Sequence, residues 1–304
     1  MTAPPRHARA ADGTELLYRV AGPADAPWLV LGNGAGCSEE FWTTALVPTL
    51  APRLRLLWWN YRGHHGSAPA ADPTAYRIEH HAADLLALLD TERIASAVFL
   101  GFSLGVQVTL EAYRRRPAAF RALALVSGSD EDPLATFAGL PLLRPLLCGM
   151  FDLGVALPGL AARVMRLTLG GPLAVPFARA TGFCERDVPE APFRAYLAQA
   201  AALPAVPYVR TLRLMAEHSA RDVVPQVAIP TLLVSGLEDT MTPPGVMERI
   251  RAALPDATWL PVAGGRHTLL LTRGGWVGRR VLEFLDRRGL LSGARTSSTA
   301  APAP

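Results

Sequence analysis

The 304-residue sequence contains no lysine, so arginine supplies all 30 of its positive charges, against 26 aspartates and glutamates. The arginines are scattered, and their longest cluster is the triplet at residues 114–116. A nucleic-acid-binding surface usually needs a basic stripe interleaved with aromatic side chains, which this pattern does not provide. We therefore expect no nucleic-acid partner, despite a net charge of +4 and an isoelectric point of about 9.3.

Cysteine is also scarce, and Cys37, Cys148 and Cys184 lie far apart in the sequence. An odd, sparse set of cysteines offers neither a disulfide framework nor the close spacing of a metal site. The first twelve residues lack the apolar core of a secretory signal peptide. These absences predict a cytoplasmic protein with no metal site.

Long uninterrupted apolar runs are missing as well. The most apolar region, residues 140–169, is broken by Pro141, Arg144, Asp152 and Pro158, whereas a membrane-spanning helix needs about 20 consecutive apolar residues. We therefore expect no membrane span. Half of the chain is nevertheless hydrophobic, and its mean hydropathy is +0.21, which predicts a large core or an apolar binding site.

Short apolar runs alternate with helical patterns through much of the chain. Runs typical of buried strands occupy residues 27–32, 54–60, 95–100, 122–127, 229–236 and 258–262. Apolar residues at helical spacing occupy residues 76–91, the stretch after residue 103, and residues 274–288. This alternation predicts an α/β fold with a doubly wound, mostly parallel sheet. Residues 1–13 are predicted to be a loose arm, and residues 14–20 an edge strand.

The pattern changes in the middle of the chain. Residues 129–223 contain proline-punctuated helical segments without a convincing strand. We predict a core formed by residues 1–128 and 224–290, an inserted helical cap at residues 129–223, and a disordered tail at residues 291–304. The apolar stretch 140–169 either lines a hydrophobic pocket or forms the cap's own core, and the sequence does not decide between these.

A Gly-x-Ser-x-Gly pattern at residues 101–105 lies between a buried run and a helical pattern. A serine on such a sharp turn exposes its hydroxyl, while the flanking glycines let the backbone pass close to its neighbours. The N–H of Leu104 begins the helix without an intrahelical acceptor, so it is free to bind an oxyanion. We therefore predict that Ser103 is a nucleophile. The alternative is that Ser103 only caps the helix.

A serine nucleophile needs a base, and the base needs a group that orients it. The sequence offers both, because Asp239 follows the strand that ends at Gly236, and His267 follows the last strand. Loops at the carboxyl ends of parallel strands face the same crevice, so these residues are expected to meet Ser103 there. Two alternatives remain: Glu238 in place of Asp239 as the acid, and His267 as a loop histidine without a catalytic role.

These residues resemble the α/β-hydrolase superfamily, in its branch of capped esterases and small-molecule hydrolases. The resemblance rests on residues 33–35, 61–67, 101–105, 236–239 and His267. It implies an α/β-hydrolase fold in which Ser103 is the nucleophile, His267 is general base and acid, and Asp239 orients the imidazole. It also implies an oxyanion hole formed by the backbone N–H groups of Ala35 and Leu104.

The chain departs from the family pattern at positions other than Ser103, Asp239 and His267. Asn33 stands where the loop commonly begins with histidine, and Asn60 stands where an aspartate often precedes the Arg-Gly segment. An extra histidine widens the spacing between Gly63 and Gly66, and Thr272 and Arg273 follow His267 where the family often has an acid.

Other reactive side chains are expected to be structural. Histidine doublets at residues 64–65 and 80–81 lack the carboxylate or cysteine pattern of a metal site. Cys37 has no base placed for it and is predicted to be a small residue in the pocket wall. His218 is predicted to lie at the surface rather than in the pocket.

The sequence thus predicts a cofactor-independent serine hydrolase of a hydrophobic carboxylic ester or thioester, monomeric or homodimeric, with a small ester-like substrate as its partner. Carbon–carbon bond hydrolysis, perhydrolysis and acyl transfer would use the same triad and remain open. So does a slow or non-catalytic receptor with a capped pocket. Epoxide hydrolases and haloalkane dehalogenases, which carry an aspartate where Ser103 stands, are disfavoured.

Overall fold

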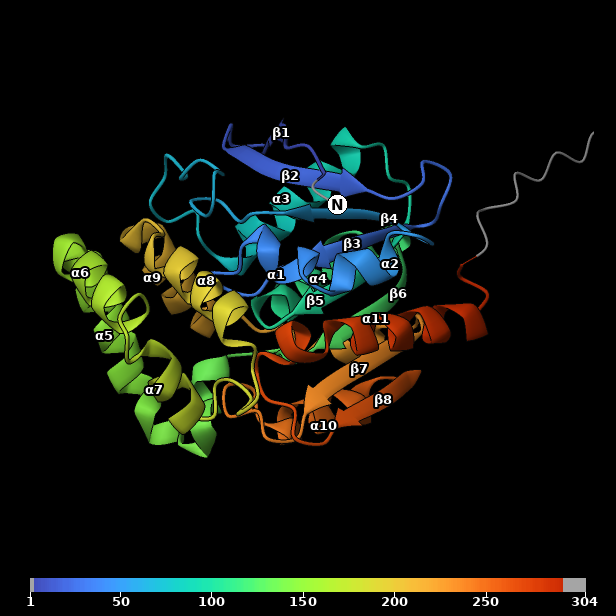
Figure 1. The fold of residues 1–304 in the computed structure, drawn as a ribbon. Coiled ribbons are helices and arrows are strands. Elements are labelled where there is room, and N and C mark those ends of the chain that lie inside the picture. Colours follow the sequence, from blue (N-terminus) through green and yellow to red (C-terminus); the bar gives the residue numbers. More distant parts are fainter. Residues whose placement is uncertain (1–2, 292–304) are drawn as a thin grey trace, which may run out of the picture.

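The computed structural model describes residues 3–291, which are organised around one eight-stranded sheet (Figure 1). The strands are β1 (Arg6–Arg9), β2 (Glu15–Ala21), β3 (Trp28–Gly32), β4 (Arg55–Trp59), β5 (Ala97–Phe102), β6 (Phe120–Val126), β7 (Thr231–Gly236) and β8 (Ala257–Val262). Their order across the sheet is β1-β2-β4-β3-β5-β6-β7-β8. The pairs β1/β2 and β2/β4 are antiparallel and all others are parallel, which confirms the predicted α/β class.

Eleven α-helices accompany the sheet within the described residues. They are α1 (Glu39–Thr43), α2 (Leu46–Leu50), α3 (Ile78–Thr91), α4 (Leu104–Arg115), α5 (Arg144–Ala156), α6 (Pro158–Thr168), α7 (Ala174–Ala180), α8 (Glu190–Ala201), α9 (Ala205–Leu214), α10 (Pro244–Ala253) and α11 (Leu269–Arg287). Short 3-10 turns lie at Pro117–Ala119, Pro133–Ala135, Phe137–Gly139, Pro141–Leu143, Met215–Glu217 and Val224–Gln226.

The central strands are buried on both faces, which explains their continuous apolar sequences. In β5, Val98 and Leu100 pack in one core layer with α2 and α11. Ala97 and Phe99 face the other layer, which contains α3, α4 and α10. Each fully buried Leu or Phe contributes about 1.5–3 kcal/mol relative to exposure. The sheet is therefore a rigid base from which the loops after its strands project.

The amino-terminal prediction was wrong. The expected loose arm contains β1, which pairs antiparallel with β2, so β2 is the second strand of the sheet rather than its edge. Only Ala8 of the four residues in β1 is buried. A strand this short and this polar leaves no alternating apolar pattern by which it could be predicted.

The closing helix begins earlier than predicted. Helix α11 starts at Leu269 rather than Gly274 and contains a break at Arg273, where φ is −130°. The prediction rested on the apolar face formed by Val277, Val281, Phe284 and Leu285, but the buried Leu269, Leu270 and Leu271 already belong to the helix. Helix α11 therefore begins directly after the loop that carries His267.

Between β6 and β7 the described chain forms helices and no strand. Helix α5 packs on α9, and α6 packs on both α8 and α9. These helices gather beyond one end of the sheet, with α5, α6 and α7 outermost (Figure 1). The predicted disordered tail lies outside the described residues except for Leu291.

No single helix of residues 3–291 is long and apolar enough to cross a membrane. The pair Pro141–Ala156 and Pro158–Thr168 reaches the required length and composition only when taken together, and it is bent by 119°.

Candidate active site

Ser103 lies on the turn between β5 and α4, in a backbone conformation that non-glycine residues rarely adopt. Its φ is 53° and its ψ is −117°, which costs about 1–3 kcal/mol and persists only when the surroundings enforce it. The turn is held by close backbone packing, since a Cβ on Gly105 would lie 2.2 Å from the carbonyl oxygen of Gly32. The Ser103 hydroxyl makes no capping hydrogen bond to α4. The helix-cap alternative is therefore wrong.

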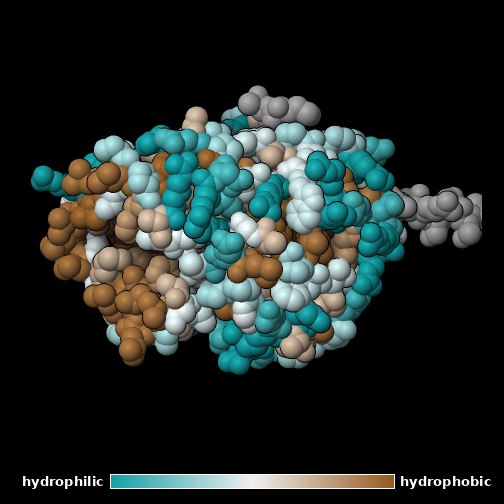
Figure 2. Space-filling model, turned by 60° about the horizontal axis from the view of Figure 1, so that its bottom comes forward, coloured by the Kyte–Doolittle hydropathy of each residue, from teal (hydrophilic) through white to brown (hydrophobic). Residues whose placement is uncertain are grey.

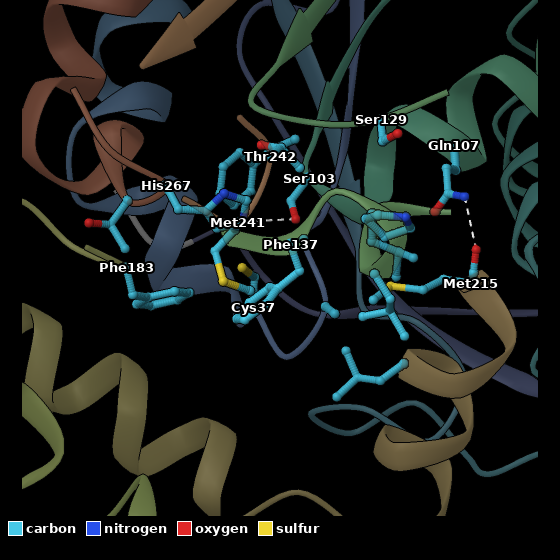
Figure 3. A pocket seen from close by; sticks show the side chains of 18 of the residues that line it. Cys37, Ser103, Gln107, Ser129, Phe137, Phe183, Met215, Met241, Thr242 and His267 are labelled. Carbon is cyan, nitrogen blue, oxygen red and sulfur yellow. Dashed lines mark hydrogen bonds between the residues drawn. The ribbon is translucent and has the colours of Figure 1, made fainter. Parts of the chain in front are cut away.

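The structure brings His267 and Asp239 to Ser103 in one hydrogen-bonded chain. His267 Nε2 lies 3.0 Å from Ser103 Oγ (Figure 3). His267 Nδ1 lies 3.0 Å from Asp239 Oδ2. The three residues follow β5, β7 and β8, which all end at the same edge of the sheet. The imidazole lies near the rings of Phe102 and Phe183, at centroid distances of 5.3 and 5.7 Å.

Both carboxylate oxygens of Asp239 accept further hydrogen bonds. Its Oδ1 accepts from the N–H groups of Met241 and Thr242 at 2.8 and 3.0 Å, and its Oδ2 accepts from Thr242 Oγ1 at 2.9 Å. Glu238 points elsewhere, with a side chain that is 56% exposed and 3.4 Å from Arg266 Nε. The structure thus places Asp239, and not Glu238, against His267.

Ser103 opens into a cavity of about 110 Å³. Most of the wall is apolar and comes from Phe41, Phe102, Leu134, Phe137, Phe183 and Met241. Gln107 and Ser129 supply polar groups on one side of Ser103, while Phe183 and Met241 lie on the other (Figure 3). A second cavity of about 570 Å³ shares Phe183, Tyr196, Tyr208 and Met241 with the first.

Ala35 and Leu104 both line the cavity. Leu104 is the first residue of α4, so its N–H has no carbonyl one turn earlier to bind. Ala35 lies on the loop after β3. Both residues therefore belong to the wall of the cavity into which Ser103 opens.

Asn33 fixes the loop that carries Ala35. Its side chain donates to the carbonyl of Trp59 at 2.5 Å and accepts from the indole N–H of Trp42. Its own carbonyl accepts from the hydroxyl of Tyr61 at 2.7 Å. The asparagine that replaces the usual histidine therefore anchors this loop from both sides.

The motif at residues 61–67 is structural. The Arg62 guanidinium is buried and forms a bidentate pair with the buried Asp84 at 2.6 and 2.9 Å, with Asp12 at 2.6 Å on its other side. Losing one partner of a buried pair typically costs about 3–5 kcal/mol. Arg62 thus ties this loop to α3 and to the amino-terminal segment, away from Ser103.

Cys37 lies in the cavity wall and is buried. Burial raises the pKa of its thiol to about 12, with Tyr196 opposing this only in part. The sulfur is therefore a thiol at neutral pH and a poor nucleophile.

Three histidines outside the Ser103 cavity are packed into the fold. His64 and His81 are buried, and no group of three or more His, Cys, Asp or Glu side chains in residues 3–291 is placed to hold a metal ion. The prediction for His218 was wrong, because it is buried, with Nε2 3.3 Å from Glu111 and Nδ1 3.5 Å from Gln107. The polar neighbours of His218 lie on α4, which local sequence around His218 could not reveal.

The burial of His64 predicts a loss of stability in acid. Burial lowers the pKa of His64 to about 4 from its ordinary 6.5, so the unfolded chain binds a proton there that the folded chain does not. The contribution of neutral His64 to the free energy of unfolding is complete above about pH 6.5. It falls as the pH drops towards 4, and about 2 kcal/mol of it is lost at pH 5. Urea unfolding of wild type and His64→Asn at pH 7 and pH 5 measures this, since asparagine keeps a donor for the Arg62 carbonyl.

The variant is expected to lose about 2 kcal/mol less than wild type between these pH values. His7→Gln, which removes an exposed histidine of β1, is the control and should lose as much as wild type. An equal loss in wild type and His64→Asn would contradict the prediction.

Sequence reasoning missed most of the cavity wall. Gln107 could have been found, because it lies four residues after Ser103 and so on the same side of α4. Phe183, Tyr196 and Tyr208 come from the helical segment between β6 and β7. The sequence of this segment does not indicate which of its side chains face Ser103.

With this geometry established, the comparisons with known proteins decide the family. Residues 27–273 match the family model described as alpha/beta hydrolase fold. The chain belongs to this family. This α/β hydrolase is 26% identical over 283 residues to a relative from Variovorax paradoxus named as a carbamate hydrolase, RutD, covering 90% of this chain and 96% of the relative.

Solved structures show the same fold. The enol-lactonase from Burkholderia xenovorans has a TM-score of 0.75 at 23% identity, covering 92% of this chain and 100% of its own. A thermophilic esterase from Thermogutta terrifontis has a TM-score of 0.76 at 19% identity, covering 95% and 100%. The predicted resemblance to α/β hydrolases is confirmed.

Proposed function

We propose that this α/β hydrolase is a serine hydrolase of apolar carboxylic esters or thioesters. The observation that carries the proposal is the unbroken chain from Asp239 through His267 to Ser103, with both contacts at 3.0 Å. A neutral imidazole in this position can accept the serine proton, and a buried carboxylate behind it stabilises the imidazolium that forms. The confined, largely apolar cavity supports an apolar substrate.

In this mechanism Ser103 Oγ attacks the carbonyl carbon while His267 Nε2 takes its proton. The negative oxygen accepts hydrogen bonds from the N–H groups of Ala35 and Leu104, each worth about 2.7–4 kcal/mol in comparable sites. His267 then protonates the leaving oxygen or sulfur, which departs and leaves an acyl group on Ser103. Water activated by the same imidazole releases the acid and restores the serine.

The two sides of the cavity suggest how the substrate lies. Phe183 and Met241 offer an apolar wall that fits the acyl chain, and the larger second cavity behind them gives the chain room to extend. Gln107 and Ser129 offer polar groups on the opposite side, where a leaving group would lie. We further propose that residues 129–223 act as a cap, because this segment supplies the wall opposite the sheet.

The substrates in the names of these proteins share one chemical feature with the proposed substrate. Carbamates and lactones, which appear in the names of a relative and of a structural neighbour, carry a heteroatom leaving group on a carbonyl carbon. An ester or thioester carries the same feature. The apolar wall here favours an apolar acyl group over a small polar carbamate.

The expected result is a rise in kcat/KM with acyl length. Each methylene buried against the apolar wall contributes about 0.8 kcal/mol, or up to about four-fold. The measurement is hydrolysis of a p-nitrophenyl ester series from acetyl to palmitoyl, with a matched carbamate for comparison. The rise in kcat/KM should stop at the acyl length that no longer fits within the two cavities.

A flat series would contradict the apolar acyl site, and a preference for the carbamate would contradict the ester assignment. Product analysis with added alcohol, amine or peroxide identifies acyl transfer or perhydrolysis. Saturable binding of the esters without turnover would favour a receptor instead.

A further inference from the structure

The exposed apolar side chains of this protein are concentrated in one place. Of the twelve large apolar side chains that are exposed in residues 3–291, eleven lie between residues 140 and 177, and the other is Leu237. Figure 2 shows hydrophobic side chains gathered at one end of the molecule, in clusters separated by less hydrophobic atoms. We call the exposed apolar residues of this stretch the apolar ridge. Soluble monomers seldom expose an apolar area of this kind unless it contacts something.

Helix α5 has apolar residues on two faces. Leu146, Met150, Leu153 and, just after the helix, Leu157 follow one another at intervals of three or four residues as an exposed stripe. Three of them, Met150, Leu153 and Leu157, line the cavity between α5 and α6. Leu142 just before the helix is 89% exposed. The opposite face packs on α9 and forms the internal core of the helical segment. The inner face therefore accounts for folding, and the outer stripe is left without a partner among the described residues.

Helix α6 adds positive charge beside the same ridge. Leu160, Val164 and Leu167 form an exposed stripe, of which Leu160 and Val164 line the cavity between α5 and α6. Arg163 and Arg166 are exposed on one flank of that stripe, and neither guanidinium makes an ion pair in the described part of the chain. An apolar stripe bordered by unpaired cations is typical of a helix that lies in a lipid interface.

Acidic groups are almost absent from this part of the molecule. Asp152 is the only acid between residues 140 and 180, and it is already paired with Arg213 at 3.0 Å. The ridge therefore presents apolar side chains together with unpaired cations, and no unpaired acid. Anionic lipid headgroups over an apolar interior complement both features.

Two other occupants fit less well. A second copy related by two-fold symmetry would bring the same unpaired arginines towards each other. Residues 292–304 contain no Leu, Ile, Val, Phe, Met or Trp, so this segment of the chain offers nothing to cover an apolar surface.

We propose that the apolar ridge docks on an anionic lipid surface, with α5 and α6 lying in the interface. The two helices are bent by 119° and pack inwards on α8 and α9, so they rest on the surface rather than cross it. Apolar side chains supply most of the affinity, and Arg163 and Arg166 supply the preference for anionic lipid.

The cavities suggest what docking achieves. A cavity of about 390 Å³ between α5 and α6 shares Thr168, Leu169 and Tyr208 with the cavity of about 570 Å³, which in turn borders the Ser103 cavity. An apolar ester dissolved in the lipid would meet this series of cavities at the docked face. This consequence rests on the proposed function, whereas the docking itself does not.

The test is sedimentation of the full chain with vesicles of equal parts phosphatidylcholine and phosphatidylglycerol. Wild type is expected to bind, and Leu146→Glu/Leu167→Glu to bind roughly 100-fold more weakly, since two leucines leave the apolar phase. Ala95→Glu/Ala118→Glu is the matched control. It adds the same charge at two exposed positions before β5 and β6, at the sheet edge opposite Ser103, and should bind like wild type.

Arg163→Gln/Arg166→Gln tests the charge. Its binding to the anionic vesicles should fall roughly five-fold for each arginine removed, and its binding to pure phosphatidylcholine vesicles should not change. Circular dichroism and hydrolysis of p-nitrophenyl acetate report whether each variant is folded, and an inactive wild type would contradict the proposed function without bearing on docking.

Three results would overturn the docking proposal. The wild type could fail to bind anionic vesicles, or the Leu146→Glu/Leu167→Glu variant could bind as well as wild type. In the third, the wild type forms a dimer and does not bind vesicles, whereas the Leu146→Glu/Leu167→Glu variant is monomeric. This result would show that a second copy covers the apolar ridge. Analytical ultracentrifugation of the same samples measures this.

Discussion

Replacing Ser103 with alanine is expected to lower kcat for ester hydrolysis by roughly 10⁴- to 10⁶-fold while substrate binding persists. Alanine removes the only hydroxyl within reach of His267 Nε2 among the described residues. The cavity wall and the backbone donors at Ala35 and Leu104 stay in place, so a small residual rate is expected from binding and oxyanion stabilisation alone. Steady-state kinetics with the best p-nitrophenyl ester measures the effect.

Ser129 provides a matched control in the same cavity. Its hydroxyl accepts from the N–H of Glu131 and makes no contact with His267. Ser129→Ala should therefore change kcat by less than about ten-fold, the loss of one neutral hydrogen bond. Similar losses in both variants would show that the cavity shape, and not the Ser103 hydroxyl, limits turnover. An active Ser103→Ala variant would show that another group is the nucleophile.

The second large effect is expected at Asp239. Asp239→Asn should lower kcat by about 10⁴-fold, because an amide nitrogen facing Nδ1 stabilises the wrong imidazole tautomer and cannot balance the imidazolium charge. Oδ1 accepts two backbone N–H bonds, so the amide oxygen is expected to stay there and the amide nitrogen to face His267. The fold should be unaffected by this nearly isosteric change.

Glu238→Gln is the paired control, since it neutralises the neighbouring carboxyl without touching His267. Its kcat should stay within about two-fold of wild type, as expected for an exposed charge. If Glu238→Gln were the more damaging change, the acid would be Glu238. The sequence alone could not separate these two adjacent residues, because both lie in the same turn after β7.

The parts of the site that were predictable are those with local signals. Ser103 lies within a Gly-x-Ser-x-Gly pattern. Gly105 is required there for a steric reason, because it approaches the backbone of Gly32 too closely for any side chain. His267 and Asp239 each follow an apolar strand, and the parallel sheet brings the ends of such strands to one edge. The family resemblance implied catalytic roles for these residues, and the Ser103→Ala and Asp239→Asn variants test those roles.

The parts that escaped prediction depend on tertiary packing. Strand β1 is polar and short, and only its pairing with β2 makes it a strand. His218 is buried through contacts with Glu111 and Gln107, more than 100 residues away. The apolar stretch after residue 140 was expected to line a pocket or to form a core, but a large share of it faces outwards. Apolar content alone does not distinguish these three environments.

Labelling with a fluorophosphonate, followed by peptide mapping in a mass spectrometer, tests the central claim most directly. This reagent forms a stable adduct with a serine that an adjacent base activates, in place of the acyl group. We predict one adduct per chain, located on Ser103, with hydrolysis lost in proportion to labelling and no labelling of Ser103→Ala. An adduct on another residue, or full hydrolysis after complete labelling of Ser103, would contradict the assignment of Ser103 as the nucleophile.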